Sequence, residues 1–339
     1  MGLRDLSRTI GRARALLAAA AYPLLCMAMF SGVPAAAEPV ARGLGADPTT
    51  ATRLARMARV QSWGYWLRFV DFDAAAAAPH DLLVVDFGIS ANRQFQRQYS
   101  LDEIALMKQR KGGGSRILLA YISIGEAERY RPYWRQEWYE PASKPAWLDK
   151  GNPQWDGNFA VRFWDPAWQK LIFGAPDSYL ERILGQGFDG VYIDRADVFG
   201  DWTRQRKSAQ ADMVSLLTAF AAHARRAKPD FLIVMQNAEE LLPDPKVMGI
   251  IDGIAKEDLF FGIKHNQEAN SKVDVDWSLE HIRMAQKAGR TALLVEYVDD
   301  PARQGTVLKR SREAGIVPYF APRGLECLRA IPGTPASGC

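Results

Sequence analysis

Short apolar runs alternate with longer amphipathic stretches from Trp63 to Phe320. The amphipathic stretches at 101–111, 208–228, 278–288 and 301–314 predict helices. Near-continuous apolar strands separated by helices are typical of a parallel sheet that is covered on its outer face. The eight predicted strands are residues 63–70, 82–88, 117–124, 190–194, 231–236, 251–257, 292–297 and 316–320.

Eight such strands predict an α/β fold, a (β/α)8 TIM barrel, in a single domain over residues 53–326. An open doubly wound sheet is the alternative, although no glycine fingerprint for a dinucleotide follows the first strand. Residues 126–168, after the third strand, are too long for one βα connection and are rich in Trp and Tyr. We expect an aromatic-rich excursion over the barrel mouth there, followed by a helix at 166–185.

The first 37 residues differ from the rest of the chain. Four Arg residues precede an apolar run from about Ala15 to Phe30, and Pro34-Ala-Ala-Ala37 follows. This order predicts a secretory signal peptide at 1–37 that is cleaved after Ala37, and therefore a secreted or periplasmic protein. An uncleaved membrane anchor is the alternative. Residues 38–52 are rich in Pro, Ala, Gly and Thr and are expected to be a flexible segment.

The net charge of the chain limits the classes of partner that it can bind. The 339-residue chain has a formal net charge of +4, and residues 1–37 hold four Arg and one Asp, so cleavage leaves +1. A nearly neutral chain lacks the basic stripe that nucleic-acid binding needs. We therefore expect no nucleic-acid partner, no stable membrane association after cleavage, and a monomer. In the tail at 327–339, Cys327 and Cys339 either form a disulfide or remain free thiols.

Acidic residues follow six consecutive predicted strands. They are Asp86; Glu126 and Glu128; Asp194 and Asp197; Glu239 and Glu240; Glu257 and Asp258; and Glu296 and Asp299. Any one of them has a simple alternative interpretation as a solvated loop charge. In a TIM barrel, however, the carboxyl ends of the strands meet on the face where active sites lie. The six together therefore predict a mouth lined by carboxylates.

Three chemistries suit such a mouth. The histidines do not follow strands and show no metal-ligand spacing, and no Gly-x-Ser-x-Gly elbow is present. We therefore expect neither a metal nor a cofactor. Glycoside hydrolysis requires two carboxyl groups across a sugar-binding site, and aromatic side chains can stack on sugars. This chemistry fits the pattern best. The four histidines are His80, His223, His265 and His281.

Side-chain alternation selects the pair. Asp194 shares a strand face with Tyr192, and Glu257 shares one with Ala255. Glu257 precedes an apolar wall at 259–261, which is expected to raise its pKa and suit a general acid/base. Arg195 is expected to favour the ionised form of Asp194, which suits a nucleophile. We therefore predict Asp194 and Glu257 as the catalytic residues in these roles.

With these residues placed, the sequence resembles glycoside hydrolase family 114, the endo-α-1,4-polygalactosaminidase family. The matching stretches are Trp63-Gly-Tyr-Trp66, Ala120-Tyr-Ile-Ser-Ile-Gly-Glu-Ala-Glu128, Phe163-Trp-Asp-Pro-Ala-Trp168, Gly187-Phe-Asp-Gly-Val-Tyr-Ile-Asp194, Gln236-Asn-Ala-Glu-Glu-Leu241, Lys256-Glu257 and Glu296-Tyr297. The resemblance implies a (β/α)8 barrel whose catalytic acids end the fourth and sixth strands, here Asp194 and Glu257. It also implies metal-free hydrolysis inside an α-1,4-linked galactosamine polymer. A partly cationic polymer suits an acid-lined groove.

Further residues at strand ends or in the excursion are predicted to bind the polysaccharide. They are Asp86, Tyr121, Glu126, Trp164, Asp197, Asn237 and Tyr297. Packing in the barrel core is the alternative for Tyr121 and Tyr297, and helix packing is the alternative for Trp164 and for a second candidate platform, Trp134. Two competing functions stay open, namely a non-catalytic carbohydrate-binding barrel and a metal-dependent hydrolase.

Overall fold

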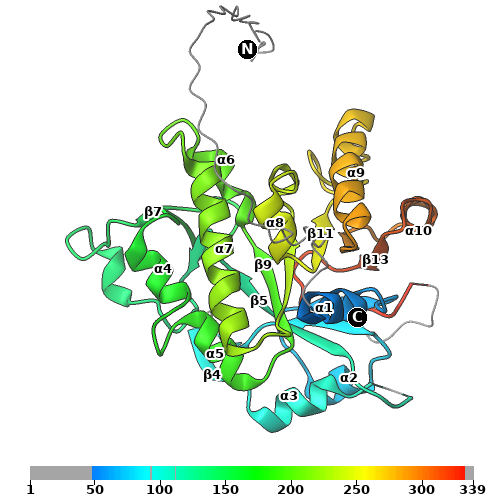
Figure 1. The fold of residues 1–339 in the computed structure, drawn as a ribbon, viewed down its shortest axis with the longest axis horizontal. Coiled ribbons are helices and arrows are strands. Elements are labelled where there is room, and N and C mark those ends of the chain that lie inside the picture. The colour runs from blue at the N-terminus through cyan, green and yellow to red at the C-terminus, as the bar shows by residue number, and fades with distance from the viewer. Residues whose placement is uncertain (1–47, 92–93, 111, 333–339) are drawn as a thin grey trace, which may run out of the picture. The chain divides into compact units, whose positions relative to one another are not determined.

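A computed structural model describes residues 48–91, 94–110 and 112–332. Its main sheet has eight parallel strands in the order β1-β2-β5-β9-β10-β11-β12-β13 (Figure 1). Each overlaps one of the eight predicted strands, which confirms the (β/α)8 prediction over the open sheet. The strands are β1 (Trp63–Trp66), β2 (Leu82–Val85), β5 (Ile117–Ser123), β9 (Gly190–Asp194), β10 (Leu232–Gln236), β11 (Gly253–Glu257), β12 (Thr291–Glu296) and β13 (Val317–Phe320).

The sheet curls into a nearly closed barrel. Its first and last strands meet where the indole N–H of Trp63 donates to the carbonyl of Val317 at 3.0 Å. The interior is filled by every second side chain, including Trp63, Tyr65 and Tyr192. The intervening side chains pack against the helices outside in a second, larger apolar cluster. Period-two alternation thus supplies both layers of the core from the same strands.

Helices cover the outside of the barrel (Figure 1). They are α2 (Phe72–Ala77), α3 (Leu101–Lys108), α4 (Pro166–Ile172), α5 (Tyr179–Gln186), α6 (Phe199–Trp202), α7 (Ala209–Ala227), α8 (Pro245–Ile250), α9 (Lys272–Lys287) and α10 (Pro301–Ala314). The single helix predicted at 166–185 is wrong. It is two helices, because Gly174 adopts φ +87° and Pro176 follows within the connection.

The excursion after the third barrel strand is a small antiparallel sheet. Its strands are β6 (Glu126–Glu128), β7 (Leu148–Gly151) and β8 (Asn158–Val161), in the order β6-β8-β7. Aromatic rings hold it, with Trp134 stacked on Phe159 at 4.8 Å and Trp138 edge-on to Trp147 at 5.1 Å. A hairpin of β3 (Gly88–Ala91) and β4 (Gln94–Gln98), not anticipated in the sequence, follows β2.

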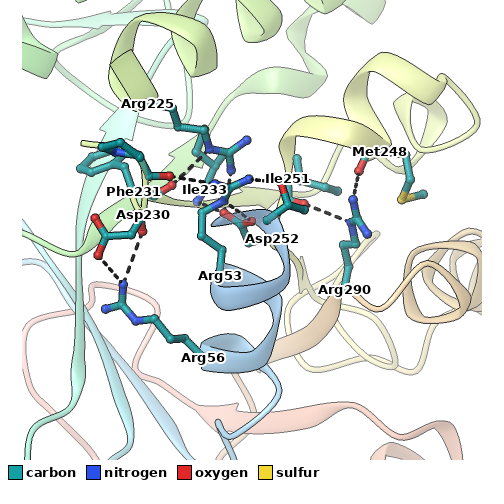
Figure 2. A network of polar contacts seen from close by, with 12 residues as sticks. Arg53, Arg56, Arg225, Asp230, Phe231, Ile233, Met248, Ile251, Asp252 and Arg290 are labelled. Carbon is teal, nitrogen blue, oxygen red and sulfur yellow. Dashed lines mark hydrogen bonds and ion pairs between the residues drawn. The ribbon is translucent and has the colours of Figure 1, made fainter. Parts of the chain in front are cut away.

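Helix α1 (Pro48–Met57) lies at the amino end of the barrel and begins inside the segment expected to be flexible. Arg53 Nε pairs with Asp252 Oδ1 at 3.1 Å, and Arg225 Nη2 pairs with Asp252 Oδ2 at 2.8 Å. The same carboxylate accepts the backbone N–H of Ile233, and Arg290 reaches the carbonyl of Ile251 (Figure 2). Asp252 thus fastens α1 to the strands of the barrel.

The predicted signal peptide at 1–37, its cleavage after Ala37, and residues 38–47 lie outside the described residues. Cys327 is described and is disulfide-bonded. The other two cysteines of the chain, Cys26 and Cys339, lie outside the described residues. Among the residues that the structure describes, no helix is long and apolar enough to cross a membrane.

Candidate active site

Side-chain alternation decides which strand-end residues face the barrel interior. The last inward-facing residues of β9, β10 and β11 are Asp194, Gln236 and Glu257. They stand above Tyr192, Val234 and Ala255, which belong to the interior apolar cluster. The two predicted acids therefore point into the barrel mouth from strands that flank β10.

A cavity of about 1550 Å³ opens at this mouth. Asp194 and Glu257 line it together with five of the residues predicted to bind substrate. These five are Asp86, Tyr121, Glu126, Asn237 and Tyr297. The structure therefore brings together most of the predicted site from six different barrel strands and their loops.

The two acids share one hydrogen-bond donor. Gln236 Nε2 donates to Asp194 Oδ1 at 3.0 Å and to Glu257 Oε2 at 2.7 Å. Because both oxygens lie within 3.0 Å of the same nitrogen, they are less than about 6 Å apart. We call Asp194 and Glu257 the dyad.

Each acid of the dyad also has donors of its own. Tyr121 Oη donates to Asp194 Oδ2 at 2.7 Å, and the backbone N–H of Arg195 donates to Oδ1 at 2.7 Å. Tyr297 Oη donates to Glu257 Oε1, and Asn237 Nδ2 donates to Oε2 at 3.3 Å. Among the described residues, the hydrogen-bond donors to both carboxyl groups are thus neutral.

Both acids have raised pKa values. Burial raises the pKa of Asp194 to about 7, and the nearby Glu257 adds to the rise. Burial likewise raises the pKa of Glu257, against the hydrogen bond from Tyr297. The expected rise in the pKa of Glu257 is confirmed. Arg195 acts to lower the pKa of Asp194, as expected, but burial and the second carboxyl outweigh that guanidinium.

The backbone turns in the same unusual way after each of the three inward-facing residues. Arg195, Asn237 and Asp258 follow Asp194, Gln236 and Glu257, and have φ of +61°, +54° and +52°. Left-handed backbone in non-glycine residues is costly and clusters at functional sites. Next to this turn, Gly125 is needed because a Cβ there would meet the carbonyl oxygen of Arg195 at 2.1 Å.

A second group of charges lines the same cavity, and we call it the arginine cluster (Asp86, Glu128 and Arg131). Arg131 Nη1 lies 2.7 and 2.8 Å from the two oxygens of Asp86, and its Nε lies 2.6 Å from Glu128 Oε2. The guanidinium is buried within 6 Å of four aromatic rings, which belong to Phe87, Tyr121, Tyr130 and Tyr179. Tyr121 links the two groups, since it contacts Arg131 through its ring and Asp194 through its hydroxyl.

Glu126 is held by the excursion. Its Oε1 accepts from Asn152 Nδ2 at 2.8 Å, and its Oε2 accepts from Asn158 Nδ2 at 3.1 Å. Arg195 Nη2 lies 3.1 Å from the same carboxylate. The guanidinium of Arg195 therefore pairs with Glu126 rather than with Asp194, its neighbour in sequence.

Two residues predicted to bind substrate do not line the cavity. Asp197 pairs instead with Arg195 at 3.6 Å. Trp164 packs edge-on against Trp202 at 5.0 Å, under the guanidinium of Arg206. The second candidate platform, Trp134, packs inside the excursion. Helix and sheet packing is therefore the correct interpretation for both tryptophans.

The ring of acids is also only partly realised. On β12 the inward positions are Val295 and Tyr297, so Glu296 faces the helices, where it accepts the N–H of Phe260 at 2.6 Å. Burial raises the pKa of Glu296 to about 8. Glu239 is buried against Lys256 at 3.1 Å. The remaining strand-end acids that do not line the cavity are Glu240, Asp258 and Asp299.

Sequence reasoning missed several lining residues, among them Tyr65, Arg131, Trp155 and Gln236. The alternation that selected Asp194 and Glu257 also applies to β10 and points to Gln236. Trp155 is 52% exposed at the cavity, so exposure rather than residue type separates it from the packed tryptophans of the excursion. No group of three His, Cys, Asp or Glu side chains that could hold a metal ion occurs among the described residues.

Eight parallel strands with a polar cavity at their carboxyl ends define a TIM-barrel protein with its site at the usual face. The model of glycoside-hydrolase family GH114 matches residues 46–334, and the chain belongs to this family. An uncharacterised protein of Deinococcus radiodurans is 34% identical over 320 residues, which cover 90% of this chain and 98% of that protein. An uncharacterised protein of Methanocaldococcus jannaschii is 34% identical over 76% of this chain and 75% of its own length.

Among solved structures, the chain is similar to the glycoside hydrolase domain of PelA from Pseudomonas aeruginosa. The TM-score is 0.60 at 17% sequence identity, over 79% of this chain and 97% of that domain. At this identity the likeness shows the shared barrel fold.

Proposed function

We propose that the chain is a glycoside hydrolase that cleaves within an α-1,4-linked galactosamine-containing polysaccharide through the Asp194–Glu257 dyad. The observation that carries the proposal is the pair of carboxyl groups that share Gln236 Nε2 at 3.0 and 2.7 Å, facing a cavity of about 1550 Å³. Membership of a glycoside hydrolase family supports a carbohydrate substrate. Export through the predicted signal peptide belongs to the same proposal.

The mechanism assigns one role to each acid. The active form of the dyad carries one proton, on Glu257, whose pKa burial raises, and Glu257 gives this proton to the glycosidic oxygen as the bond from that oxygen to C1 breaks. The ionised carboxylate of Asp194 bonds to C1 and forms a glycosyl-enzyme ester. Water, giving a proton to Glu257, then attacks C1 and displaces Asp194. The net change is one glycosidic bond hydrolysed, with a new reducing end.

The spacing of the dyad supports retention of configuration. Retaining glycosidases place their two carboxyl groups about 5–5.5 Å apart, whereas inverting enzymes leave about 6.5–9.5 Å for a water. The shared nitrogen limits the nearest oxygens of the dyad to less than about 6 Å. The donors of Asp194 also fit a nucleophile, since three neutral hydrogen bonds orient it without a neutralising salt bridge.

Charge supports an amino-sugar substrate. The cavity lining holds eight acidic residues against five basic ones. An excess of carboxylates attracts a polymer that carries protonated amines, at close range and at low salt. The family resemblance provides the identity of the sugar.

The test is incubation with partially deacetylated galactosaminogalactan, followed by an assay for reducing ends with and without chelator. We expect new reducing ends in both conditions. Asp194→Asn and Glu257→Gln should each lower kcat by roughly 10³-fold or more while the protein stays folded. Glu240→Gln is the matched control, because this exposed acid also follows a barrel strand but does not line the cavity.

The outcomes separate the alternatives. Binding without cleavage by the wild type would favour a non-catalytic carbohydrate-binding barrel. Loss of activity with chelator would favour a metal-dependent hydrolase. Full activity in either dyad variant would overturn the assignment of that acid.

A further inference from the structure

We propose that Gln236 is a positioning residue that sets the distance between the two acids of the dyad and governs how they share a proton. The inference rests on the proposed function. Gln236 ends β10, which lies between β9 and β11 in the sheet, so its side chain stands between the two acids. Its amide nitrogen carries two hydrogens, and the two contacts use one for each carboxyl group.

The amide is held in one orientation. The side chain is 2% exposed, and Gln236 Oε1 has no hydrogen-bond partner among the described residues. A buried carbonyl without a partner is costly. The opposite orientation would set this oxygen against the oxygens of both carboxyl groups and remove a donor from each. The two carboxyl groups therefore fix the orientation of the amide, and the amide in turn fixes the positions of the two carboxyl groups.

Gln236 differs from the other donors because it serves both acids. Tyr121 and the Arg195 N–H contact Asp194 alone, whereas Tyr297 and Asn237 contact Glu257 alone. A donor to the ionised form lowers the affinity of a carboxyl group for its proton. Removing the shared donor should therefore raise the titration midpoints of both acids together.

Other groups also act on the dyad, and a substitution at Gln236 leaves them in place. Beneath it lie the hydroxyls of Tyr65 and Tyr192 from β1 and β9. Arg195 and Asp197 act from the loop after β9, Lys256 and Asp258 flank Glu257, and Arg323 pairs with Asp258 from the loop after β13. A rise in the titration midpoints of both acids in a Gln236 variant is therefore due to the loss of the amide.

The experiment compares Gln236→Met and Gln236→Glu with Gln205→Met. Methionine keeps the length of the side chain without a donor, and glutamate keeps its shape but adds a carboxyl group. Gln205 lines the same cavity, is exposed, and makes none of the hydrogen bonds that the dyad accepts from the described residues. On the galactosamine polymer, Gln236→Met should move both limbs of the kcat/KM–pH profile up by roughly one pH unit. Its kcat should fall by roughly 10²-fold, as expected for misplaced reacting groups.

A readout independent of activity is the ¹³C NMR titration of the side-chain carboxyl carbons of Asp194 and Glu257. We expect both midpoints to rise in Gln236→Met, to rise further in Gln236→Glu, and to stay unchanged in Gln205→Met. If Gln236→Met does not fold, the isosteric Gln236→Glu carries the test.

Unchanged midpoints in Gln236→Met, or a shift in only one acid, would overturn the inference. A fall in kcat without any shift in the limbs or midpoints would mean that Gln236 is only a packing residue, and would overturn it too. Shifted midpoints in a protein that does not cleave the polymer would leave the role of Gln236 standing and reject the proposed function.

Discussion

The arginine cluster and the dyad are both built from two carboxyl groups in the same cavity, but they are compensated in different ways. In the arginine cluster, a buried guanidinium lies within 2.8 Å of both acids. Burial acts to lower the pKa of Arg131, yet the carboxylates of Asp86 and Glu128 together raise it above its ordinary value. In the dyad, tyrosine hydroxyls and amide groups are the donors.

This difference in compensation indicates a structural role for the arginine cluster and a chemical role for the dyad. A buried guanidinium keeps its proton and fixes the geometry around it. Neutral donors orient a carboxyl group but leave its proton available, and burial, with the nearby Glu257, raises the pKa of Asp194 to about 7. We infer that the arginine cluster holds Tyr121 and the excursion in place, whereas the dyad exchanges protons.

The largest effect on stability should come from breaking the arginine cluster. Arg131→Met leaves two buried carboxyl groups without their counter-ion, which should lower the free energy of unfolding by about 3–5 kcal/mol. Urea denaturation at neutral pH measures it. Arg129→Met is the control, because the partly exposed pair of Arg129 with Asp156 should be worth about 1 kcal/mol or less. Equal losses in the two variants would contradict the comparison.

In the dyad, by contrast, removing a carboxylate is expected to raise the free energy of unfolding. Asp194 has a pKa of about 7 in the folded protein against about 3.9 in the unfolded chain, so the folded state binds the proton more tightly. Its stabilising contribution is fully present below about pH 4 and is lost as the pH rises to about 7. Asp194→Asn removes this loss.

At pH 8, Asp194→Asn should therefore be more stable than the wild type by about 2–3 kcal/mol. Solvent in the cavity and the coupling to Glu257 keep this gain in the free energy of unfolding below the value that the full pKa shift of Asp194 would give. The gain should shrink toward pH 4, as followed by thermal unfolding across this range. Glu128→Gln is the matched variant, and it should lose stability at pH 8, because it takes a partner from the buried guanidinium of Arg131. A stability gain in both variants would refute the distinction.

A smaller effect sharpens the roles within the dyad. Tyr121→Phe removes one donor from Asp194, so the acidic limb of the kcat/KM–pH profile should rise by about half to one pH unit. Tyr297→Phe removes a donor from Glu257, so the basic limb should rise instead. If the two variants moved the opposite limbs, Asp194 would be the general acid and Glu257 the nucleophile.

The smallest effect concerns the tryptophans. Trp155→Ala should raise KM for the polymer about fivefold, equivalent to about 1 kcal/mol of lost contact area, with little change in kcat. Trp164→Phe should leave KM unchanged, because Trp164 packs against Trp202 and does not itself line the cavity. Initial rates over a range of polymer concentrations distinguish the two, and a larger rise in KM for Trp164→Phe would restore the original prediction.

The sequence predicted the barrel and the dyad because both depend on short-range patterns. Apolar runs locate the strands, and period-two alternation places Asp194 above Tyr192 and Glu257 above Ala255. The same rule, applied to β12, would have placed Tyr297 inside and Glu296 outside. A count of acids after strands does not contain this information, and the predicted ring of six was therefore too large.

Other parts of the site depend on contacts that no local pattern reveals. Arg131 meets Asp86 across 45 positions of the chain. The tryptophans of the excursion are alike in composition, and only packing decides that Trp155 is exposed whereas Trp134 is covered. The pKa of Asp194 depends on burial, which outweighs the adjacent Arg195.

Helix α1 has a consequence for how the chain acquires its fold. The ion pair that fastens it joins Arg53 to Asp252, 199 positions apart (Figure 2). At about 5–20 residues per second, a ribosome needs roughly 10–40 s to make the intervening chain. During that time Arg53 lacks this counter-ion, and closing so long a loop is slow. The ion pair of Arg53 can thus form only after Asp252, the residue just before the sixth barrel strand, has been synthesised.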